Sequence, residues 1–578
     1  MAPATAYAVE LLGQLVRLGV RHLVVAPGSR SQAPALVAAE FERVGLVRLH
    51  VRIDERSAAF LALGLGLESG VPAAIITTSG SAVANLHPAV LEAHHAGVPL
   101  LVLSADRPAE LQGVGANQTT TQPGLFAGAV RDEWDVPAPR GTADESAHAI
   151  ATATAAWRAA TGDGDPRAAG PVHLNLALAD PLSSPWTAPD ALVAELGSDA
   201  DQPEPGGHPP VITAPREVAR VDADRPTAVI AGSGAGPRAE QAARDLGAVL
   251  FAEVASGAHF GPNLVVPYRE VIRDPDFLER LERVVVFGRP TLSREVPWLI
   301  ERGGVELIGV RAPGVEDYNP GRAIGRFVDE VLADGADSVA DLTRDWVRPW
   351  VGVSRAFLEQ GEDLAPDVAL APGDKARHEL EAVRRPVTRR TLVEAVWRAT
   401  WPHDRLVLGA SRLIRELDRS ASGKAVRVHA NRGLAGIDGT VSTGIGVALA
   451  QQQGLRATGT ASAVGVTRVL LGDLAFLHDV GGLALPEAED APRIIVVVGN
   501  DEGGTIFDLL EAGEAARGVG GAATAAFARV MRTPQSTSVE QLARAYGWEY
   551  RRVETRGELD PALSGCAGPT IVEVALAR

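Results

Sequence analysis

Oxygen-bearing residues follow two short apolar runs in the last third of the sequence. Asp473 comes just after the run Arg468–Leu471, and Asp501 just after the run Arg493–Val498. If both runs are strands of one parallel sheet, their carboxyl ends meet at the edge where such sheets bind ligands. A cation such as Mg²⁺ takes one or two carboxylates and usually phosphate oxygens of a ligand, and Gly503 would let the backbone approach a phosphate. Gly-Asp and Asn-Asp are also ordinary turn pairs, so the pattern favours a diphosphate–metal site without requiring one.

Residues 53–66 are similar to residues 437–450. Each segment is an Ile-Asp turn that leads into a stretch rich in Gly, Ala and other small residues, which permit close helix packing. If the similarity is not chance, the chain contains two related domains. One of them then has Glu55 where the other has Gly439.

Short apolar runs alternate with longer Ala- and Leu-rich stretches along most of the chain. Helices are expected at residues 57–68 and 82–94. Strands are expected at residues 22–26, 73–77, 100–104, 172–177, 227–231, 284–288, 306–310, 405–408, 426–429, 468–471, 493–498 and 570–574. This alternation is typical of parallel sheets with crossover helices, so we predict the α/β class with three doubly wound parallel-sheet domains.

Changes in composition mark the joints between the three domains. Residues 183–226 are crowded with Pro, Asp and Gly, as linkers are, and a second interruption lies within 351–385. The predicted division is a first domain at 1–185, a linker at 186–225, a central domain at 226–350, a linker at 351–385 and a last domain at 386–578.

The overall composition excludes several classes of protein. A chain that is 46% hydrophobic and 22% charged is globular rather than disordered. Its net charge of −17 argues against nucleic acid or an anionic membrane as a partner. The single cysteine, Cys566, excludes disulfide frameworks, iron–sulfur clusters and thiolate zinc sites. Residues 1–14 lack the pattern of a signal peptide and no apolar run is long enough to span a membrane, so we expect a cytoplasmic protein.

Arginine provides nearly all of the positive charge. Lys375 and Lys424 are the only lysines among 55 basic residues. Compositional bias accounts for most of this excess. The alternative for a few arginines is that they bind planar anions such as carboxylates with two N–H groups, which lysine does poorly.

The two oxygen-rich strand ends resemble the cofactor motif of thiamin diphosphate enzymes, in which Gly-Asp-Gly is followed by Asn-Asn or a similar pair. Here Leu474 stands at the third position, and Asp501 replaces the second asparagine. Within this superfamily, residues 472–479 and 500–507 resemble the 2-succinyl-5-enolpyruvyl-6-hydroxy-3-cyclohexene-1-carboxylate (SEPHCHC) synthase family of menaquinone biosynthesis. The resemblance implies that Asp473, Asp501 and the carbonyl of Gly503 coordinate Mg²⁺, or Mn²⁺ in its place. A different alignment gap would make Asn500 the second ligand.

Further segments match the same family in order along the first and last domains, and the match is thin in the central domain. They are residues 26–31, 50–65, 78–88, 105–108, 115–118, 411–415 and 430–439. The resemblance implies a pyrimidine-binding, a central Rossmann-like and a diphosphate-binding domain. It also implies that Glu55 hydrogen-bonds the aminopyrimidine ring of the cofactor, and that Ile437 keeps the cofactor bent. The other implied cofactor-binding residues are Gly80, Ser411, Gly436, Gly472, Asp473, Leu474, Asp501, Gly503 and Ile506.

The implied reaction decarboxylates 2-oxoglutarate and adds the succinyl carbanion equivalent to isochorismate, giving SEPHCHC and CO₂. Both substrates are dicarboxylates, so the arginines inside matched segments are the candidates to bind them. The implied catalytic residues are Glu55, Arg30, Arg107, Asn117, Gln118 and Arg415. The implied substrate-binding residues are Ser29, Arg30, Arg107, Asn117, Gln118, Arg294, Ser411, Arg415, Arg432, Ile506, Phe507 and Leu510.

In this superfamily the cofactor lies between domains of two subunits, which implies a homodimer or homotetramer. Two other functions are considered. Another thiamin diphosphate-dependent 2-oxoacid carboligase or decarboxylase, such as acetohydroxyacid synthase, would carry the commoner Gly-Asp-Gly. A catalytically silent assembly or regulatory protein would not need both Glu55 and Asp473. The glycine turn at residues 227–236 suggests a dinucleotide site, but Pro237 stands at the third glycine position, so we expect no nucleotide there.

Overall fold

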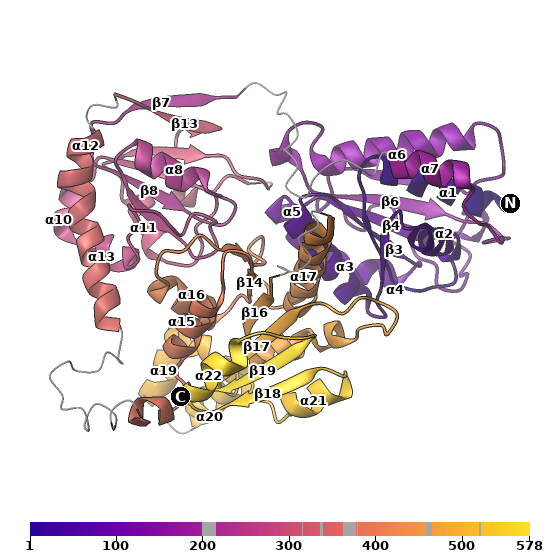
Figure 1. The fold of residues 1–578 in the computed structure, drawn as a ribbon. Coiled ribbons are helices and arrows are strands. Elements are labelled where there is room, and N and C mark those ends of the chain that lie inside the picture. The colour runs from indigo at the N-terminus through magenta and orange to yellow at the C-terminus, as the bar shows by residue number, and fades with distance from the viewer. Residues whose placement is uncertain are drawn as a thin grey trace.

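The computed structural model describes residues 1–198, 216–314, 316–335, 339–361, 377, 380–457, 465–519 and 522–577. Figure 1 shows three α/β domains, with the first and last side by side. The central domain contacts the first, since Arg289 donates to the His95 carbonyl and Arg167 pairs with Asp329. Every ladder between the described strands of their sheets is parallel. The predicted fold class is therefore confirmed.

The first domain is a six-stranded sheet in the order β2-β1-β3-β4-β6-β5. Its strands are β1 (His22–Val25), β2 (Arg48–Val51), β3 (Ala73–Thr77), β4 (Leu100–Asp106), β5 (Glu133–Val136) and β6 (Pro171–Ala177). Its helices are α1 (Pro3–Arg17), α2 (Gln32–Arg43), α3 (Glu55–Ser69), α4 (Ser81–Asn85), α5 (His87–Ala96), α6 (Glu145–Thr161) and α7 (Asp190–Ser198). The single helix expected at 82–94 is two helices, because Pro88 has no N–H for a continuous ladder and instead occupies the first turn of α5.

The last domain repeats this arrangement, with the strand order β15-β14-β16-β17-β19-β18. Its strands are β14 (Arg405–Leu408), β15 (Arg427–His429), β16 (Thr467–Gly472), β17 (Ile494–Asn500), β18 (Glu549–Val553) and β19 (Thr570–Ala575). Its helices are α15 (Arg389–Ala399), α16 (Arg412–Ser420), α17 (Thr440–Ala457), α18 (Asp473–His478), α19 (Glu511–Val519), α20 (Ala522–Phe527), α21 (Val539–Ala545) and α22 (Arg556–Leu563). Numbered along its own chain segment, each sheet runs 2-1-3-4-6-5, so the short sequence similarity does mark two domains of the same topology.

Helices α3 and α17, which begin at the two similar segments, pack against each other between the two sheets (Figure 1). A Cβ atom built at Gly64 would lie 2.1 Å from the carbonyl oxygen of Thr443, and one at Gly446 would lie 2.3 Å from that of Leu61. Only glycine permits this approach. A single apolar core runs from one sheet to the other through both helices and includes Ile75 and Val469.

The central domain is a five-stranded sheet in the order β12-β11-β10-β8-β9, with a separate two-stranded ribbon of β13 and β7. The strands are β7 (Val218–Asp222), β8 (Thr227–Ala231), β9 (Val249–Ala252), β10 (Arg283–Phe287), β11 (Glu306–Val310), β12 (Phe327–Val328) and β13 (Glu330–Asp334). The helices are α8 (Arg238–Asp245), α9 (Tyr268–Val271), α10 (Pro275–Arg280), α11 (Glu295–Arg302), α12 (Val339–Leu342) and α13 (Arg348–Gly361). The glycine turn after β8 has a packing role, because a Cβ at Gly232 would lie 2.0 Å from the backbone nitrogen of Pro290.

Ordered elements extend into both ranges that were expected to be linkers. Helix α7 packs on the first domain, with Leu196 in its core, and β7 pairs with β13 of the central domain. Helix α13 continues the central domain to Gly361. Burial of apolar side chains and strand pairing hold these segments in place despite their Pro- and Gly-rich surroundings. The rest of the second expected linker lies partly outside the described residues.

Among the described residues, no helix combines the length and apolar character that crossing a bilayer requires. Cys566 is buried in the core of the last domain.

Candidate active site

Two carboxylates lie side by side at the carboxyl edge of the last sheet. Asp473 begins α18 directly after β16, and Asp501 follows β17, the neighbouring parallel strand. Both residues are buried, with 6% and 8% of their surfaces exposed. Burial and the negative charge of Asp501 raise the pKa of Asp473, while N–H groups of Leu474 and Gly503 oppose this shift. The two carboxylates are thus close enough to interact, and a cation between them would relieve their repulsion.

The turn after β17 has an unusual backbone conformation. Glu502 has φ 58° and Gly503 has φ 127°, and both values lie in the region that disfavours side chains. A Cβ at Gly503 would also lie 2.2 Å from the carbonyl oxygen of Arg532, so glycine is required there. Asn500 is engaged on both sides of its amide: Nδ2 donates to Glu573 at 2.7 Å, and Oδ1 accepts from the Glu502 N–H at 3.1 Å. This favours Asp501 over Asn500 as a ligand for a metal.

Asp501 itself is held through one carboxylate oxygen. Arg389, the first residue of α15, donates from Nε and Nη2 to Oδ2 at 2.9 and 2.8 Å. The hydroxyl of Thr505 donates to the same oxygen. Among the residues that the structure describes, none makes a hydrogen bond to Oδ1. The sequence reasoning missed Arg389, because it lies far from Asp501 in the chain and outside every matched segment.

The residues present fit a metal bound through a phosphate ligand. Among the described residues, no group of three or more His, Cys, Asp or Glu side chains is placed to enclose an ion. Two carboxylates and one carbonyl are instead the partial set that Mg²⁺ takes when a diphosphate supplies further oxygens. Ser411 lies beside this edge, since a Cβ at Gly472 would be 4.0 Å from its hydroxyl, and that hydroxyl does not cap α16.

Two arginines form a cationic group next to Ser411. Arg415 donates from Nη1 to the Ser411 carbonyl at 2.7 Å, so the two lie on one face of α16. Arg432 is 5% exposed and contacts Thr291 of the central domain, but its Nε and Nη1 have no hydrogen-bond partner in the described part of the chain. Burial lowers the pKa of both arginines, and the charge of Arg432 lowers that of Arg415 further. Buried N–H donors without partners indicate a place for an anion.

Glu253 is a buried carboxylate whose charge acts on both arginines. Burial, together with the charge of Asp418, raises the pKa of Glu253 to about 8, and its Oε1 accepts the Leu292 N–H at 2.5 Å. Because this environment disfavours the charged carboxylate, Glu253 opposes the positive charge of the arginine pair less than an ordinary glutamate would.

The remaining predicted residues of the last domain occupy the rim of the site. Ile506 and Phe507 lie half-buried on the 3₁₀ helix Thr505–Leu509, and Leu510 follows it. Ile437 is 38% exposed on the segment before α17. Arg294 is not drawn into the arginine pair: its side chain is 74% exposed and lies 4.0 Å from Glu511.

A second group of predicted residues gathers at the carboxyl edge of the first sheet. Arg107, directly after β4, donates from Nη1 to the hydroxyl of Ser79 and to the carbonyl of Gln118 at 2.7 Å. The Gln118 amide donates to the Ser79 carbonyl at 3.0 Å. Burial and the charge of nearby Arg30 lower the pKa of Arg107. Three further predicted residues lie at this edge. Ser29 and Asn117 are exposed, and the N–H of Gly80 donates to Gln122 at 2.9 Å.

Glu55 is the first residue of α3. Asp54 caps the helix by accepting the N–H groups of Arg56 and Ser57 at 2.9 and 3.4 Å, which orients the first turn. In the part of the chain that the structure describes, the Glu55 carboxylate makes no hydrogen bond or ion pair. Beside it, the side chain of Ile53 is 81% exposed. The carboxylate is therefore free to bind a ligand.

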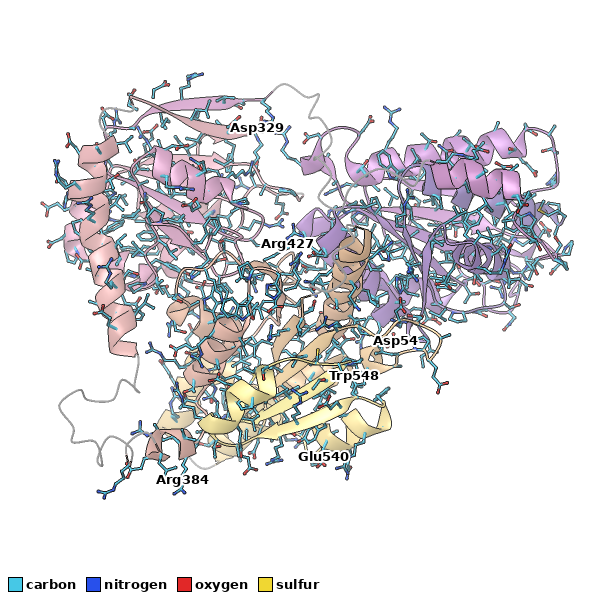
Figure 2. All side chains as sticks on the ribbon, viewed as in Figure 1. Asp54, Asp329, Arg384, Arg427, Glu540 and Trp548 are labelled. Carbon is cyan, nitrogen blue, oxygen red and sulfur yellow. The ribbon has the colours of Figure 1, made fainter. Side chains whose placement is uncertain are left out.

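Residues of the last domain form hydrogen bonds to both sides of the turn that carries Glu55. On one side, Glu489 accepts the Val51 N–H at 2.6 Å and Nη1 of Arg52 at 2.9 Å. On the other side, Arg56 donates to the His478 carbonyl at 2.7 Å. Figure 2 labels Asp54 at this junction of the two domains. The sequence reasoning did not identify Glu489, for which no motif gave a signal.

Asp479 completes the junction. It is fully buried and accepts the hydroxyl of Ser57 at 3.3 Å and the N–H of Ser442 at 2.7 Å, which joins the starts of α3 and α17. Burial raises the pKa of Asp479 to about 6, despite these hydrogen bonds and the charge of Arg56.

The two groups of site residues are carried by different domains of the chain. Among the described residues, no hydrogen bond or ion pair joins Glu55, Arg30 or Arg107 to the residues around Asp473. The structure thus forms two half-sites, one on each of the two similar domains.

Comparisons with known proteins find relatives along the whole chain. Residues 7–126 match the family described as thiamine pyrophosphate enzyme, N-terminal TPP binding domain. A protein of Leifsonia xyli subsp. xyli, named 2-succinyl-5-enolpyruvyl-6-hydroxy-3-cyclohexene-1-carboxylate synthase, is 53% identical over 595 residues, covering 100% of this chain and 97% of that protein. Proteins of the same name are 52% identical in Clavibacter michiganensis subsp. michiganensis, covering 100% of this chain and 97% of the relative, and 36% identical in Mycobacterium bovis, covering 99% and 97%.

Proposed function

The chain belongs to the SEPHCHC synthase family, and from this premise we propose how its residues carry out the family's reaction. It is a thiamin diphosphate-dependent transferase of menaquinone biosynthesis that forms a carbon–carbon bond. Its reaction decarboxylates 2-oxoglutarate and transfers the succinyl group to isochorismate. Bound thiamin diphosphate supplies the carbon nucleophile and the electron sink for this chemistry.

The carboxyl edge of the last sheet holds the diphosphate end of the cofactor. Asp473, Oδ1 of Asp501 and the carbonyl of Gly503 bind Mg²⁺, or Mn²⁺ in its place, and the cation binds the diphosphate. The support for this assignment is the buried carboxylate pair together with the strained turn that fixes Gly503. Gly472, Leu474, Ser411 and Gly436 surround the same edge.

Glu55 hydrogen-bonds the aminopyrimidine ring of the cofactor and holds a proton there. Its free carboxylate, its fixed helix start and the clamp from Glu489 and Asp479 support this role. Ile437 provides an apolar contact that orients the cofactor, and Gly80 provides close backbone approach.

The two arginine groups bind the substrate carboxylates. Arg415 and Arg432 present N–H donors beside the diphosphate edge, and Arg30 and Arg107 present donors beside Gln118 in the other half-site. Ile506, Phe507 and Leu510 form an apolar wall that excludes water, with Asn117 and Ser29 as further polar contacts at the first edge. Arg294 approaches from the central domain at the rim.

A complete site forms between two copies of the chain. Among the described residues no hydrogen bond or ion pair joins the half-sites directly, and each is bordered by exposed apolar side chains, Ile53 on one and Ile437 on the other. We therefore propose a homodimer or a homotetramer with Glu55 of one subunit facing Asp473 of another. The enzyme is proposed to act in the cytoplasm, without nucleic acid as a partner.

One assay tests the function. Purified protein is mixed with thiamin diphosphate, Mg²⁺, 2-oxoglutarate and isochorismate, and the loss of isochorismate is followed. We expect consumption that requires the cofactor and both substrates. Consumption that ignores 2-oxoglutarate would reject the proposal. Turnover of pyruvate alone would favour a different carboligase, and no turnover with bound cofactor would favour a catalytically silent protein.

A further inference from the structure

The metal edge carries more negative charge than a divalent cation can balance. Asp473 and Asp501 are both buried there, and the diphosphate of the cofactor adds further anionic oxygens. Asp501 stands where the general motif has a neutral asparagine. Buried like charges in this arrangement repel one another strongly unless a positive group compensates them. The chain therefore needs a compensating cation that a site built on asparagine would not need.

Arg389 is placed to be this cation. Its guanidinium is buried against Asp501, with 12% and 10% of the two side chains exposed, and two of its N–H groups converge on Oδ2. With the hydroxyl of Thr505 as a third donor, Oδ2 is fully occupied. The carboxylate thus keeps a single available oxygen, Oδ1, as an asparagine amide does.

The arginine is also anchored independently of Asp501. It begins α15, whose N-terminus is capped by Thr388 accepting the Thr391 N–H at 3.1 Å. Its Nη1 donates to the carbonyl of Ala577 at 3.4 Å. These contacts set the position of the guanidinium and, through it, the rotation of the Asp501 carboxylate.

We propose that Arg389 is a positioning residue that neutralises Asp501 and turns its Oδ1 toward the bound cation. The proposal rests on the proposed function, in which that edge binds Mg²⁺ and the cofactor diphosphate. The proposal adds Arg389, which lies outside the sequence motif, to the metal site. It also explains why the motif tolerates an aspartate at position 501.

A pairwise exchange tests this idea. In Arg389→Met the charge of Asp501 is uncompensated and repels the diphosphate, and in Asp501→Asn the charge of Arg389 is uncompensated and repels the metal. In the double variant both charges are gone. Since removal of a residue that supports a metal ligand typically weakens binding about 10–100-fold, we expect each single variant to bind the cofactor that much more weakly. The double variant should bind at least about tenfold more tightly than Arg389→Met, because the two effects are not additive.

The readout is the Kd of thiamin diphosphate at saturating Mg²⁺, measured by titration calorimetry on the full chain. Arg390→Met serves as the matched control, because Arg390 is the next residue of α15 but pairs with Glu394 at 2.8 Å instead. We expect its Kd to equal that of the unmodified protein. Thermal unfolding of every variant confirms the fold, and Arg389→Gln replaces Arg389→Met in the same cycle if the methionine variant does not fold.

A double variant that binds no more tightly than Arg389→Met would overturn the proposal, as would unchanged affinity in Asp501→Asn. Failure of the proposed function gives a different result: the unmodified protein would then show no Mg²⁺-dependent binding of thiamin diphosphate at all.

Discussion

The first and last domains share one fold but carry opposite chemistry at the same positions. Each sheet runs 2-1-3-4-6-5, and each third strand leads into the site. In the first domain the third and fourth strands are followed by Ser79, whose hydroxyl donates to the Gln118 carbonyl at 2.9 Å, and by Arg107, a cationic donor. In the last domain the corresponding strands are followed by Asp473 and Asp501, which are acceptors. One edge therefore suits carboxylates, and the other suits a cation with its phosphate ligand.

The starts of α3 and α17 differ in the same way. Glu55 begins α3 with a free carboxylate, whereas Gly439 precedes α17 with φ 62°. A Cβ at Gly439 would lie 1.9 Å from Cγ of Phe60, so the ring of the partner helix fills the space that a side chain would need. The last domain uses this position for packing, and the first uses it for chemistry. A shared fold therefore does not assign a shared role to equivalent positions.

The largest expected effect comes from removing the Glu55 carboxylate, which has no counterpart in the last domain. Glu55→Gln should lower turnover by about 10²–10⁴-fold, the range typical for loss of a group that moves protons, because glutamine cannot hold the proton at the aminopyrimidine ring. Steady-state isochorismate consumption measures the effect. Exposed Glu110 in the same domain provides the control, and Glu110→Gln should be fully active. Full activity of Glu55→Gln would contradict the proposed role.

Asp473→Asn tests the buried carboxylate pair, which has no counterpart in the first domain. It removes one of the two buried carboxylates, so the affinity for thiamin diphosphate at limiting Mg²⁺ should fall by about 10–100-fold. Titration of tryptophan fluorescence with the cofactor measures the change. Ser79→Ala, at the corresponding strand end of the first domain, should leave this affinity unchanged. An equal loss in both variants would show that the two edges do not differ in this way.

The close contact of α3 with α17 predicts a loss of stability. Gly64→Ala places a methyl group 2.1 Å from the Thr443 carbonyl, and such overpacking typically costs about 1–3 kcal/mol. Gly70→Ala is the matched control at the end of the same helix, because its φ of 71° is strained but no atom lies within 4 Å. It should cost about 1 kcal/mol. Urea unfolding measures both, and equal costs would argue against the tight helix contact.

A pH dependence of stability is expected at the junction of the two domains. Because the pKa of Asp479 is about 6 in the folded protein and its ordinary value is 3.8, folding favours the protonated form. The charge of Asp479 therefore does not lower the unfolding free energy below about pH 4. Its destabilising effect grows as the pH rises to about 6, reaches about 2–3 kcal/mol and stays constant above that pH. Asp479→Asn removes this dependence.

Urea unfolding of both proteins between pH 4 and 7 checks the prediction. The unfolding free energy of Asp479→Asn, relative to the unmodified chain, should rise across this range. A difference that stays constant with pH would show that Asp479 does not titrate in this way.

Much of the framework was predictable because its signals are local. The apolar strand runs and glycine turns define most strands of all three sheets, since strand formation and turn geometry depend on neighbouring residues. Two of the missed strands lack such a run: β2 is only half-buried, and β5 is mostly polar. Strand β9 is a buried apolar run that the prediction overlooked. Helix α7 and strand β7 were assigned to a linker, because only their packing on other elements orders them.

By itself, the sequence determined the fold class, the duplicated topology and the residues that the family motifs contain, because each of these is written in contiguous segments. Only the tertiary structure decided which residues support them. Arg389 reaches Asp501, and Glu489 and Asp479 reach the turn of Glu55, from distant parts of the chain. Such contacts depend on how sheets and helices pack in space, and no local spacing encodes them.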